Sequence, residues 1–256
     1  TSEVQGNCGF TAGPVTKEHY EDLMSYLANT TVLSEEEKKK WKWPSQADFI
    51  REELAAHGLP FNIAPLVGHG TIKVGVMGFA KRKPTTEELN KMLDLLRYEL
   101  DQGLFGMSSG LEYEPGSYTS TEELVELCKL VKEYGGIYST HMRNEGRYLL
   151  DSIESSIEIS RKTGVSLLIS HLKSQYRPNW GKVTSALQMI DEARESGVNV
   201  DFDVYPYTAF GSGLIDLIPP WAKEHGAEKM VELLKDAETR EKVIQDMKSD
   251  HDHWEN

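Results

Sequence analysis

Two short β-prone runs, each ending on a histidine, stand out in the hydrophobic pattern of the chain. The first covers residues 135–141 and ends on His141; the second covers residues 165–171 and ends on His171. Between them, residues 148–162 carry apolar side chains at roughly helical spacing. The pattern predicts a strand, a helix and a second strand, which together form a βαβ unit whose strands are parallel neighbours.

The same alternation of strands and helices extends along most of the chain. Strands are predicted near residues 2–6, 62–67, 104–109, 136–140, 165–170 and 198–204. Helices are predicted over residues 19–28, 46–57, 86–102, 121–134, 148–162, 181–196 and 224–248. This order is typical of an α/β fold with a parallel sheet, and 256 residues suit a TIM-like β/α barrel, which needs about 250. Six strands make such a barrel incomplete, since a closed one has eight.

The histidines at the two strand ends are the first candidates for chemistry. In a β/α barrel the carboxyl ends of the strands carry the active site, so His141 and His171 are expected to lie close together there. Two neutral imidazoles can bind a divalent metal such as zinc. The alternative is that two unrelated polar residues merely end their strands.

Cys8 lies just past the first predicted strand, with Gly6 and Gly9 allowing a sharp turn around it. A thiolate in this position is a candidate metal ligand, although a buried, inert cysteine is the commoner case. His69, between two glycines, either contacts the site or only marks a tight turn.

Other cysteines and histidines have plainer interpretations. Cys128 lies inside a predicted helix, where core packing is expected. His251 and His253 have the spacing of a metal-binding pair, but no strand precedes them and a disordered tail is favoured.

Composition and charge narrow the class of protein. The formal net charge of −13 argues against nucleic acid or an anionic membrane as partner. No apolar run approaches the length of a transmembrane helix, and residues 1–9 do not resemble a signal peptide. Two cysteines give no disulfide framework, so a cytoplasmic location is expected.

Five motifs occur in an order that resembles the N-acyl-D-amino-acid deacylases (D-aminoacylases) of the amidohydrolase superfamily. They are Gly6-Asn7-Cys8-Gly9, Gly110-Leu111-Glu112-Tyr113-Glu114-Pro115-Gly116, Thr140-His141-Met142-Arg143, Ser170-His171-Leu172-Lys173 and Asp203-Val204-Tyr205-Pro206-Tyr207. The resemblance runs to about Trp221. It implies a zinc-dependent, distorted β/α barrel of the metal-dependent hydrolase type that hydrolyses the amide of N-acylated D-amino acids.

The resemblance also assigns roles to individual residues. Cys8, His141 and His171 are implied as zinc ligands, which favours a metal-binding Cys8 over an inert one. Groups that hold the small-molecule substrate are implied at Lys173 and Tyr205, and Tyr113 is a third candidate. A tyrosine hydroxyl and a lysine ammonium suit a substrate carboxylate. Arg143 is a further candidate for an anion, with a structural ion pair as the alternative.

Parts of the family pattern are not found in the chain. The family's H-x-H pair would lie before Thr1, and the aspartate that serves as general base would lie after Asn256. We therefore expect the central part of a catalytic barrel over residues 1–221, followed over 222–256 by the helical start of an insertion covering the active site. We also expect low activity from the chain alone, and self-association or a complementing chain at its open barrel edges.

Two other functions remain open from the residues. A cyclic amidohydrolase with dihydroorotase-like activity would use the same metal chemistry. A noncatalytic zinc-binding scaffold domain would need the same ligands without the general base.

Overall fold

The chain divides into two compact units. The computed structural model describes residues 1–28, 30–211, 213, 218–223 and 226–250. One unit, the sheet unit, comprises Thr1–Ser174 and Gly181–Tyr205, and the other, the helical unit, comprises Gln175–Trp180 and Pro206–Asn256. That a separate domain begins after residue 221 stays a prediction.

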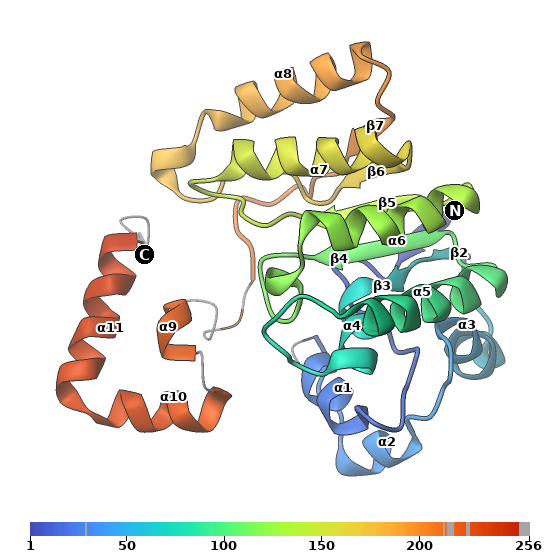
Figure 1. Ribbon diagram of the computed structural model, residues 1–256, viewed down its shortest axis with the longest axis horizontal. Coiled ribbons are helices and arrows are strands. Elements are labelled where there is room, and N and C mark those ends of the chain that lie inside the picture. The colour runs from blue at the N-terminus through green and yellow to red at the C-terminus, as the bar shows by residue number, and fades with distance from the viewer. Residues whose placement is uncertain (29, 212, 214–217, 224–225, 251–256) are drawn as a thin grey trace. The chain divides into compact units, whose positions relative to one another are not determined.

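Parallel strands form the centre of the sheet unit (Figure 1). They are β1 (Ser2–Gln5), β2 (Asn62–Pro65), β3 (Val67–Gly68), β4 (Gly106–Gly110), β5 (Ile137–His141), β6 (Ser166–Ile169) and β7 (Val200–Phe202). β1 pairs with β2, and the other strands form a sheet in the order β3-β4-β5-β6-β7, with every pairing parallel. All six predicted strands, and with them the parallel α/β fold, are confirmed.

The second predicted strand is divided at Leu66 and joins the two sheets. Its first half, β2, pairs with β1, and its second half, β3, pairs with β4. The Leu66 N–H donates to the Gln5 carbonyl at 2.8 Å, while the Phe105 N–H donates to the Pro65 carbonyl at 2.8 Å. One segment thus hydrogen-bonds to neighbours on both sides, so the strands continue from β1 to β7.

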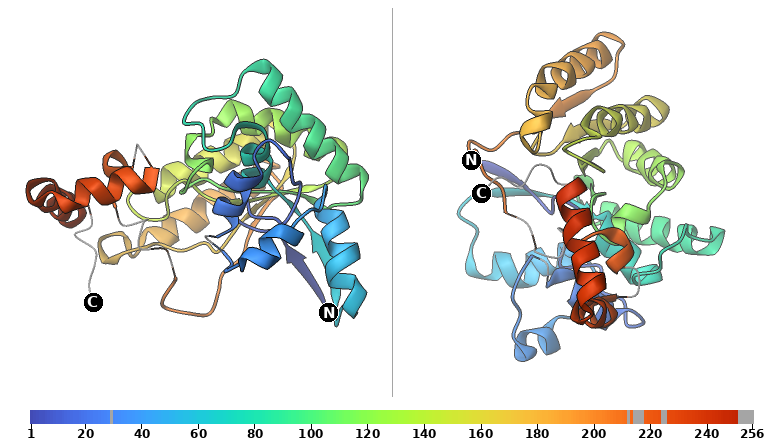
Figure 2. Two further views of the ribbon diagram at one scale, coloured as in Figure 1. Left: turned by 90° about the horizontal axis from the view of Figure 1, so that it is seen from below. Right: turned by 90° about the vertical axis from the view of Figure 1, so that its left-hand side faces the viewer.

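Helices follow the strands and lie side by side along the sheet (Figure 1, Figure 2). They are α5 (Thr86–Asp101), α6 (Thr121–Glu133), α7 (Leu149–Thr163) and α8 (Lys182–Glu195), each close to its predicted range. Their apolar faces and the strands share one buried core, which includes Met92, Leu96, Met107, Leu124, Leu127, Tyr138, Ile153 and Ile157. Cys128 is fully buried in this core, as predicted.

The start of α5 illustrates how local sequence fixes a helix end. The Glu88 N–H donates to the Thr85 hydroxyl at 3.2 Å, and the Thr85 N–H donates to the Glu88 carboxylate at 2.7 Å. This reciprocal pair is the capping box that the sequence contains.

The remaining helices belong to the strand connections and to the helical unit. The sheet unit also contains α1 (Tyr20–Leu27), α2 (Glu35–Lys40), α3 (Gln46–Phe49), a π-helical turn η1 (Ile50–Leu54) and the 3₁₀ turns η2 (Ala55–His57) and η3 (Gly116–Tyr118). The helical unit contains a 3₁₀ turn, η4 (Arg177–Asn179), and the helices α9 (Pro220–Lys223), α10 (Gly226–Lys235) and α11 (Ala237–Asp250).

Helix α4 (His69–Met77) is not indicated by the sequence pattern. Its residues include two glycines and four β-branched residues, which have low helix propensity. All of them except Val76 are buried, so packing inside the sheet unit, rather than propensity, stabilises this helix.

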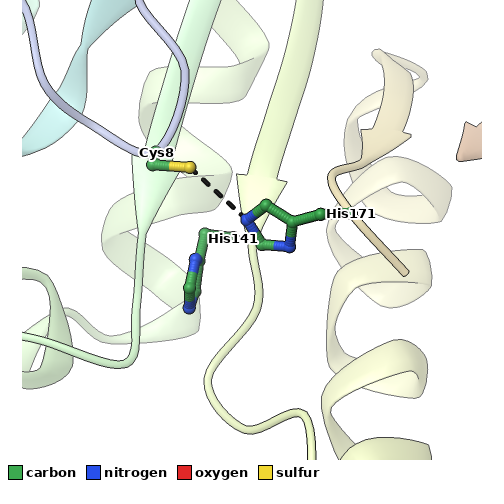
Figure 3. Close-up of side chains that lie close together, drawn as sticks. All are labelled: Cys8, His141 and His171. Atoms are coloured by element: carbon green, nitrogen blue, oxygen red, sulfur yellow. Dashed lines mark hydrogen bonds between the residues drawn. The ribbon is translucent and has the colours of Figure 1, made fainter. Parts of the chain in front are cut away.

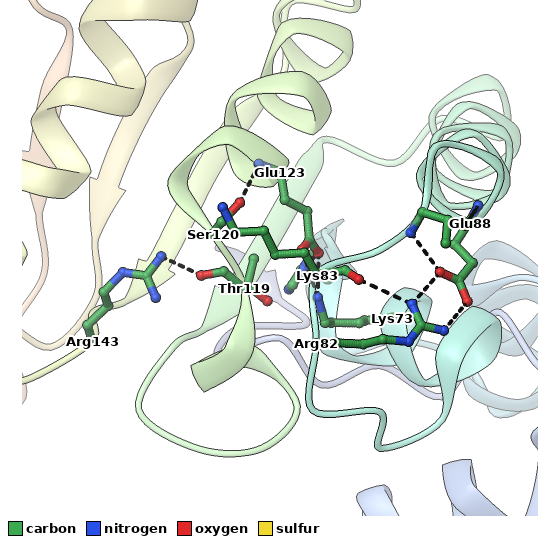
Figure 4. Close-up of polar contacts among 10 residues, drawn as sticks. Lys73, Arg82, Lys83, Glu88, Thr119, Ser120, Glu123 and Arg143 are labelled. Carbon is green, nitrogen blue, oxygen red and sulfur yellow. Dashed lines mark hydrogen bonds and ion pairs between the residues drawn. The ribbon is translucent and has the colours of Figure 1, made fainter.

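A buried ionic network joins α4 to α6. The Lys73 ammonium lies 2.8 Å from both carboxylate oxygens of Glu123, and His69 Nε2 lies 3.0 Å from Glu123 Oε1. The three side chains are at most 1% exposed. Figure 4 shows Lys73 meeting Glu123 beneath Ser120, whose hydroxyl accepts the Glu123 N–H. The network therefore fixes the start of α6 against α4.

Replacing Glu123 with alanine should strongly destabilise the protein. The change would leave the buried Lys73 ammonium without its carboxylate partner, and breaking a buried ion pair in this way costs about 3–5 kcal/mol. Urea unfolding of Glu123→Ala, with the exposed neighbour Glu122→Ala as control, measures the effect. Equal loss of stability in the two variants would contradict a structural role for the network.

Glu99 of α5 is a second buried carboxylate, and it holds the start of α3. Its two oxygens accept the Gln46 N–H at 2.8 and 3.1 Å. Burial raises the pKa of Glu99 to about 7, although the N–H groups of Gln46 and Ala47 favour the ionised form.

Stability should therefore fall as the pH rises through the Glu99 titration. Between about pH 4.5 and 7 the folded chain holds a proton on Glu99 that the unfolded chain releases, a difference of about 3 kcal/mol. Glu99→Gln keeps an acceptor but cannot ionise, so its unfolding free energy should lack this decline. Urea unfolding across this pH window, with the exposed Glu87→Gln as control, measures it. Parallel curves for Glu99→Gln and the unmodified chain would refute the assignment.

Candidate metal centre

The structure brings Cys8, His141 and His171 together (Figure 3). One ligand atom from each lies within 4.8 Å of the other two. Cys8 Sγ lies 3.5 Å from His171 Nε2, and the centroids of the two imidazole rings are 4.6 Å apart. A thiol and two imidazoles so close together form a donor set that suits zinc.

Strand register explains how the histidines meet. β5 and β6 are parallel, and Thr140 pairs with Ile169 at their carboxyl ends. Both strands therefore end at the same edge of the sheet, and His141 and His171 lie there. The His171 backbone has a φ of 42°, which turns the chain sharply after β6. Its N–H donates to Asp203 Oδ1, which follows β7, so the neighbouring strand holds this turn in place.

The turn that carries Cys8 is built against the end of β4. Cys8 has a φ of 56°, and Gly6 and Gly9 on either side have φ values of 82° and 80°. A side chain at Gly9 would collide with the backbone of Gly110, 2.9 Å from its Cβ position. Ser108 fastens the turn, since its hydroxyl accepts the Gly9 N–H at 3.0 Å and donates to the Gly6 carbonyl. Left-handed backbone is costly outside glycine and is often found at functional sites.

Each histidine has a carboxylate on its other ring nitrogen. His141 Nε2 lies 2.8 Å from Glu112 Oε2, and His171 Nδ1 lies 2.8 Å from Glu145 Oε1. Glu112 follows β4 and Glu145 follows β5, so both come from strand-end loops. The carboxylates can hold the two rings in fixed orientations.

These contacts favour ionised groups at the centre. Burial opposes ionisation of the Cys8 thiol, but hydrogen bonds to His141 and His171 lower its pKa to about 6. Burial also disfavours charged imidazoles, yet the hydrogen bonds to Cys8 and to the carboxylates raise the pKa of His141 to about 10 and that of His171 to about 9. A thiolate is thus available near neutral pH, the form that binds metals, whereas each imidazolium ring would release one proton when a metal binds.

Lys173 and Tyr205 lie beside the centre. The Lys173 ammonium pairs with Glu145 Oε2 and lies 5.5 Å from the centroid of the Tyr205 ring. The Tyr205 ring is 6.4 Å from that of His171, and burial raises the pKa of its hydroxyl, which keeps it protonated. Both side chains are therefore close enough to face a ligand at this centre.

Tyr113 and Arg143 are placed differently from the other predicted substrate groups. The Tyr113 hydroxyl donates to the Cys8 carbonyl, and its ring packs edge-on against His141 at 5.2 Å. Arg143 Nη2 donates to the Thr119 carbonyl at 2.7 Å (Figure 4). Both make structural contacts, and their roles toward a substrate stay predictions.

The other histidines considered from the sequence lie elsewhere. His69 begins α4 and is bonded to Glu123 in the buried network. His251 and His253 lie outside the described residues.

Glu112 is the site residue to which the sequence analysis gave no role. Its position two residues after the end of β4 was the available signal, because the carboxyl ends of parallel strands meet at one edge. Glu145 and Asp203 are likewise engaged at the site, Glu145 by His171 and Lys173 and Asp203 by the His171 N–H.

The described residues include no helix that is both long and apolar enough to cross a membrane.

Comparison with known proteins identifies the family. No family model matches the chain. A D-aminoacylase from Alcaligenes xylosoxydans xylosoxydans is 34% identical over 209 residues, which is 82% of this chain and 41% of the relative. An N-acyl-D-glutamate deacylase from the same organism is 30% identical over 246 residues, 91% of this chain and 48% of the relative. The chain thus spans less than half the length of these curated relatives.

Solved structures share the fold. A crystal structure of N-acyl-D-glutamate deacylase from Bordetella bronchiseptica, complexed with zinc and a phosphonate inhibitor that mimics the tetrahedral intermediate, matches with a TM-score of 0.70 and 32% identity. The match covers 81% of this chain and 42% of that one. A crystal structure of D-aminoacylase, described as defining a novel subset of amidohydrolases, also has a TM-score of 0.70, at 33% identity. The sheet unit is therefore a partial β/α barrel of the amidohydrolase type, and the chain belongs to the N-acyl-D-amino-acid deacylase family.

Proposed function

We propose that Cys8, His141 and His171 bind zinc. The observation that carries this proposal is the convergence of one thiol and two imidazoles within 4.8 Å of one another, with a carboxylate on the outer nitrogen of each ring. Support also comes from the Bordetella deacylase, which was crystallised with zinc. The low pKa of Cys8, about 6, supplies the thiolate that such a ligand requires.

We further propose that the protein to which this chain belongs hydrolyses the amide of N-acyl-D-amino acids to a D-amino acid and a carboxylate. Zinc held at such a centre would polarise the acyl carbonyl and activate a water. Lys173 and Tyr205, close to His171, would bind the substrate carboxylate through an ammonium and a hydroxyl. Arg143 and Tyr113 would contribute less, because each already binds a backbone carbonyl.

The proton-transfer group is proposed to be an aspartate other than the carboxylates described at the centre. Glu112 binds His141, Glu145 binds both His171 and Lys173, and Asp203 accepts the N–H of His171. A carboxylate held in these contacts serves to orient other groups. The curated relatives are more than twice as long as the stretch they share with this chain, and the aspartate is expected in that additional length.

A cytoplasmic location is retained as part of the proposal. Both cysteines are free thiols, Cys8 at the metal centre and Cys128 in the core. Reducing conditions preserve thiols in this state. Association through the edge strands β1 and β7, which each pair on one side only among the described strands, also stays a proposal.

Removing the Cys8 thiol should lower zinc binding. We expect Cys8→Ala to retain little zinc after dialysis, because two imidazoles alone make a weaker site than two imidazoles with a thiolate. Elemental analysis of the purified chains measures the metal content. Cys128→Ala is the matched control, since it removes a buried thiol from the core without touching the centre. Equal zinc in Cys8→Ala and the unmodified chain would exclude Cys8 as a ligand.

Substrate preference tests the proposed reaction. N-acetyl-D-amino acids should be hydrolysed in preference to their L-counterparts and to dihydroorotate as a cyclic amide. Release of the free amino group is the measurement. Preference for the cyclic amide would favour a dihydroorotase-like enzyme, and no hydrolysis of any compound by the full-length protein would favour a zinc-binding scaffold.

The chain alone should be slow in this assay. Loss of general acid–base catalysis costs about 10²- to 10⁴-fold in rate, so a chain extended at both ends to include the H-x-H pair and the aspartate should be faster by that factor. Comparable rates would mean that a carboxylate within these residues, with Asp203 and Glu145 the first candidates, transfers the proton.

A further inference from the structure

We infer that Glu112 and Glu145 are positioning residues, one for each histidine of the metal centre, and that Glu145 also sets the position of Lys173. The inference rests on the zinc site proposed above. Neither carboxylate would touch the metal, and the two differ because Glu145 also pairs with Lys173.

Glu112 determines which nitrogen of His141 is left for the centre. Its carboxylate lies 2.8 Å from His141 Nε2, so the proton on Nε2 is donated to Glu112, and Nδ1 is the nitrogen that would release its proton to a metal. The loop that carries Glu112 is anchored two residues later, where Glu114 accepts hydrogen bonds from Lys81 at 3.0 Å and from the Tyr118 hydroxyl at 2.6 Å. Glu112 is thus presented by a braced loop, although its own side chain is 36% exposed.

For His171 the two ring nitrogens have exchanged places, because Glu145 lies against Nδ1 rather than Nε2. Its Oε1 lies 2.8 Å from Nδ1, so Nε2, the atom 3.5 Å from the Cys8 thiol, is the nitrogen that would release its proton to a metal at the centre. The Glu145 side chain is completely buried, so water does not compete for its oxygens. The charge of a buried carboxylate is screened less by water than that of an exposed one, so its attraction for the His171 ring is stronger.

Lys173 makes the role of Glu145 different from that of Glu112, because it contacts both Glu145 and His171. Its ammonium pairs with the second oxygen of Glu145 and also lies 3.1 Å from His171 Nδ1. An ammonium can only donate, so a bond from Lys173 to Nδ1 would require the proton to sit on Nε2, where it would block a metal. The Glu145 carboxylate lies against both groups, with Oε1 2.8 Å from His171 Nδ1 and Oε2 paired with the Lys173 ammonium, and its charge favours a proton on Nδ1 over one on Nε2. It therefore couples a metal ligand to a substrate-binding candidate, whereas Glu112 serves the ligand alone.

A second cation between these carboxylates is the competing interpretation. Ligand atoms of Glu112, His141 and Glu145 also lie within 4.8 Å of one another. The Lys173 ammonium on Glu145 opposes it, because a cation there would be repelled at close range. The geometry therefore favours orientation over metal binding.

Zinc affinity in carboxylate variants of the full chain tests the inference. Competition with a chromophoric chelator should show about 10- to 100-fold weaker zinc binding in Glu112→Ala and in Glu145→Ala. Glu112→Gln should restore most of the loss, because its amide oxygen still accepts the Nε2 proton. Matched controls are Glu122→Gln for an exposed carboxylate and Glu99→Gln for a buried one, and circular dichroism confirms folding of each variant.

Ligand binding at saturating zinc separates the two carboxylates. Calorimetry with N-acetyl-D-methionine should give an unchanged affinity for Glu112→Gln and a weaker one for Glu145→Gln, which leaves Lys173 without its anionic partner. If the Glu145 variants do not fold, the zinc affinities of Glu112→Ala and Glu112→Gln decide the inference.

The outcomes distinguish this inference from the proposed function. Zinc binding by the unmodified chain with equal affinity in all variants would overturn the positioning role alone. Loss of a second equivalent of zinc in Glu112→Ala, with the first retained at full affinity, would overturn it in favour of a cation site. Failure of the unmodified chain to bind zinc would overturn the proposed centre and this inference with it. Failure to bind N-acetyl-D-methionine, with zinc bound, would overturn the proposed substrate class.

Discussion

The parallel register of neighbouring strands is the constraint on which this site depends. β4, β5 and β6 all run in one direction, so their carboxyl ends carry Glu112, His141 and His171 to the same edge of the sheet. The chain contributes Cys8 to that edge through a turn packed on Ser108 and Gly110. The backbone hydrogen bonds between the strands thus fix the positions of these side chains more precisely than loops alone would.

Left-handed backbone at Cys8 and His171 adds a local cost to this arrangement. Each has a positive φ, a conformation that costs a non-glycine residue of the order of 1–3 kcal/mol. The surrounding contacts hold both residues in place, through the Ser108 hydroxyl at one turn and the Asp203 carboxylate at the other. Strain concentrated on two of the three candidate ligands is consistent with a site selected for chemistry rather than for stability.

Buried charge is used in two distinct ways in the sheet unit. Around Glu123 a lysine and a histidine close a network that fastens α4 to α6 inside the core. Around Glu145 a lysine and a histidine form a similar triad, but it borders the Cys8 thiol and is partly open to solvent. The chemical groups are the same in both, and only their position relative to the carboxyl ends of the strands separates a structural network from a candidate metal centre.

Hydrophobic period, capping residues and glycines act over a few neighbouring positions, so the order of strands and helices could be predicted from the amino-acid sequence. It also indicated His141 and His171, since each ends a strand, and the resemblance to the deacylases added Cys8 as a ligand. Three features became visible only in the folded chain: α4 is helical against its propensity, His69 is buried with Glu123, and Glu112 reaches His141 from 29 positions away. These depend on burial and on contacts between distant segments, which a local pattern does not encode.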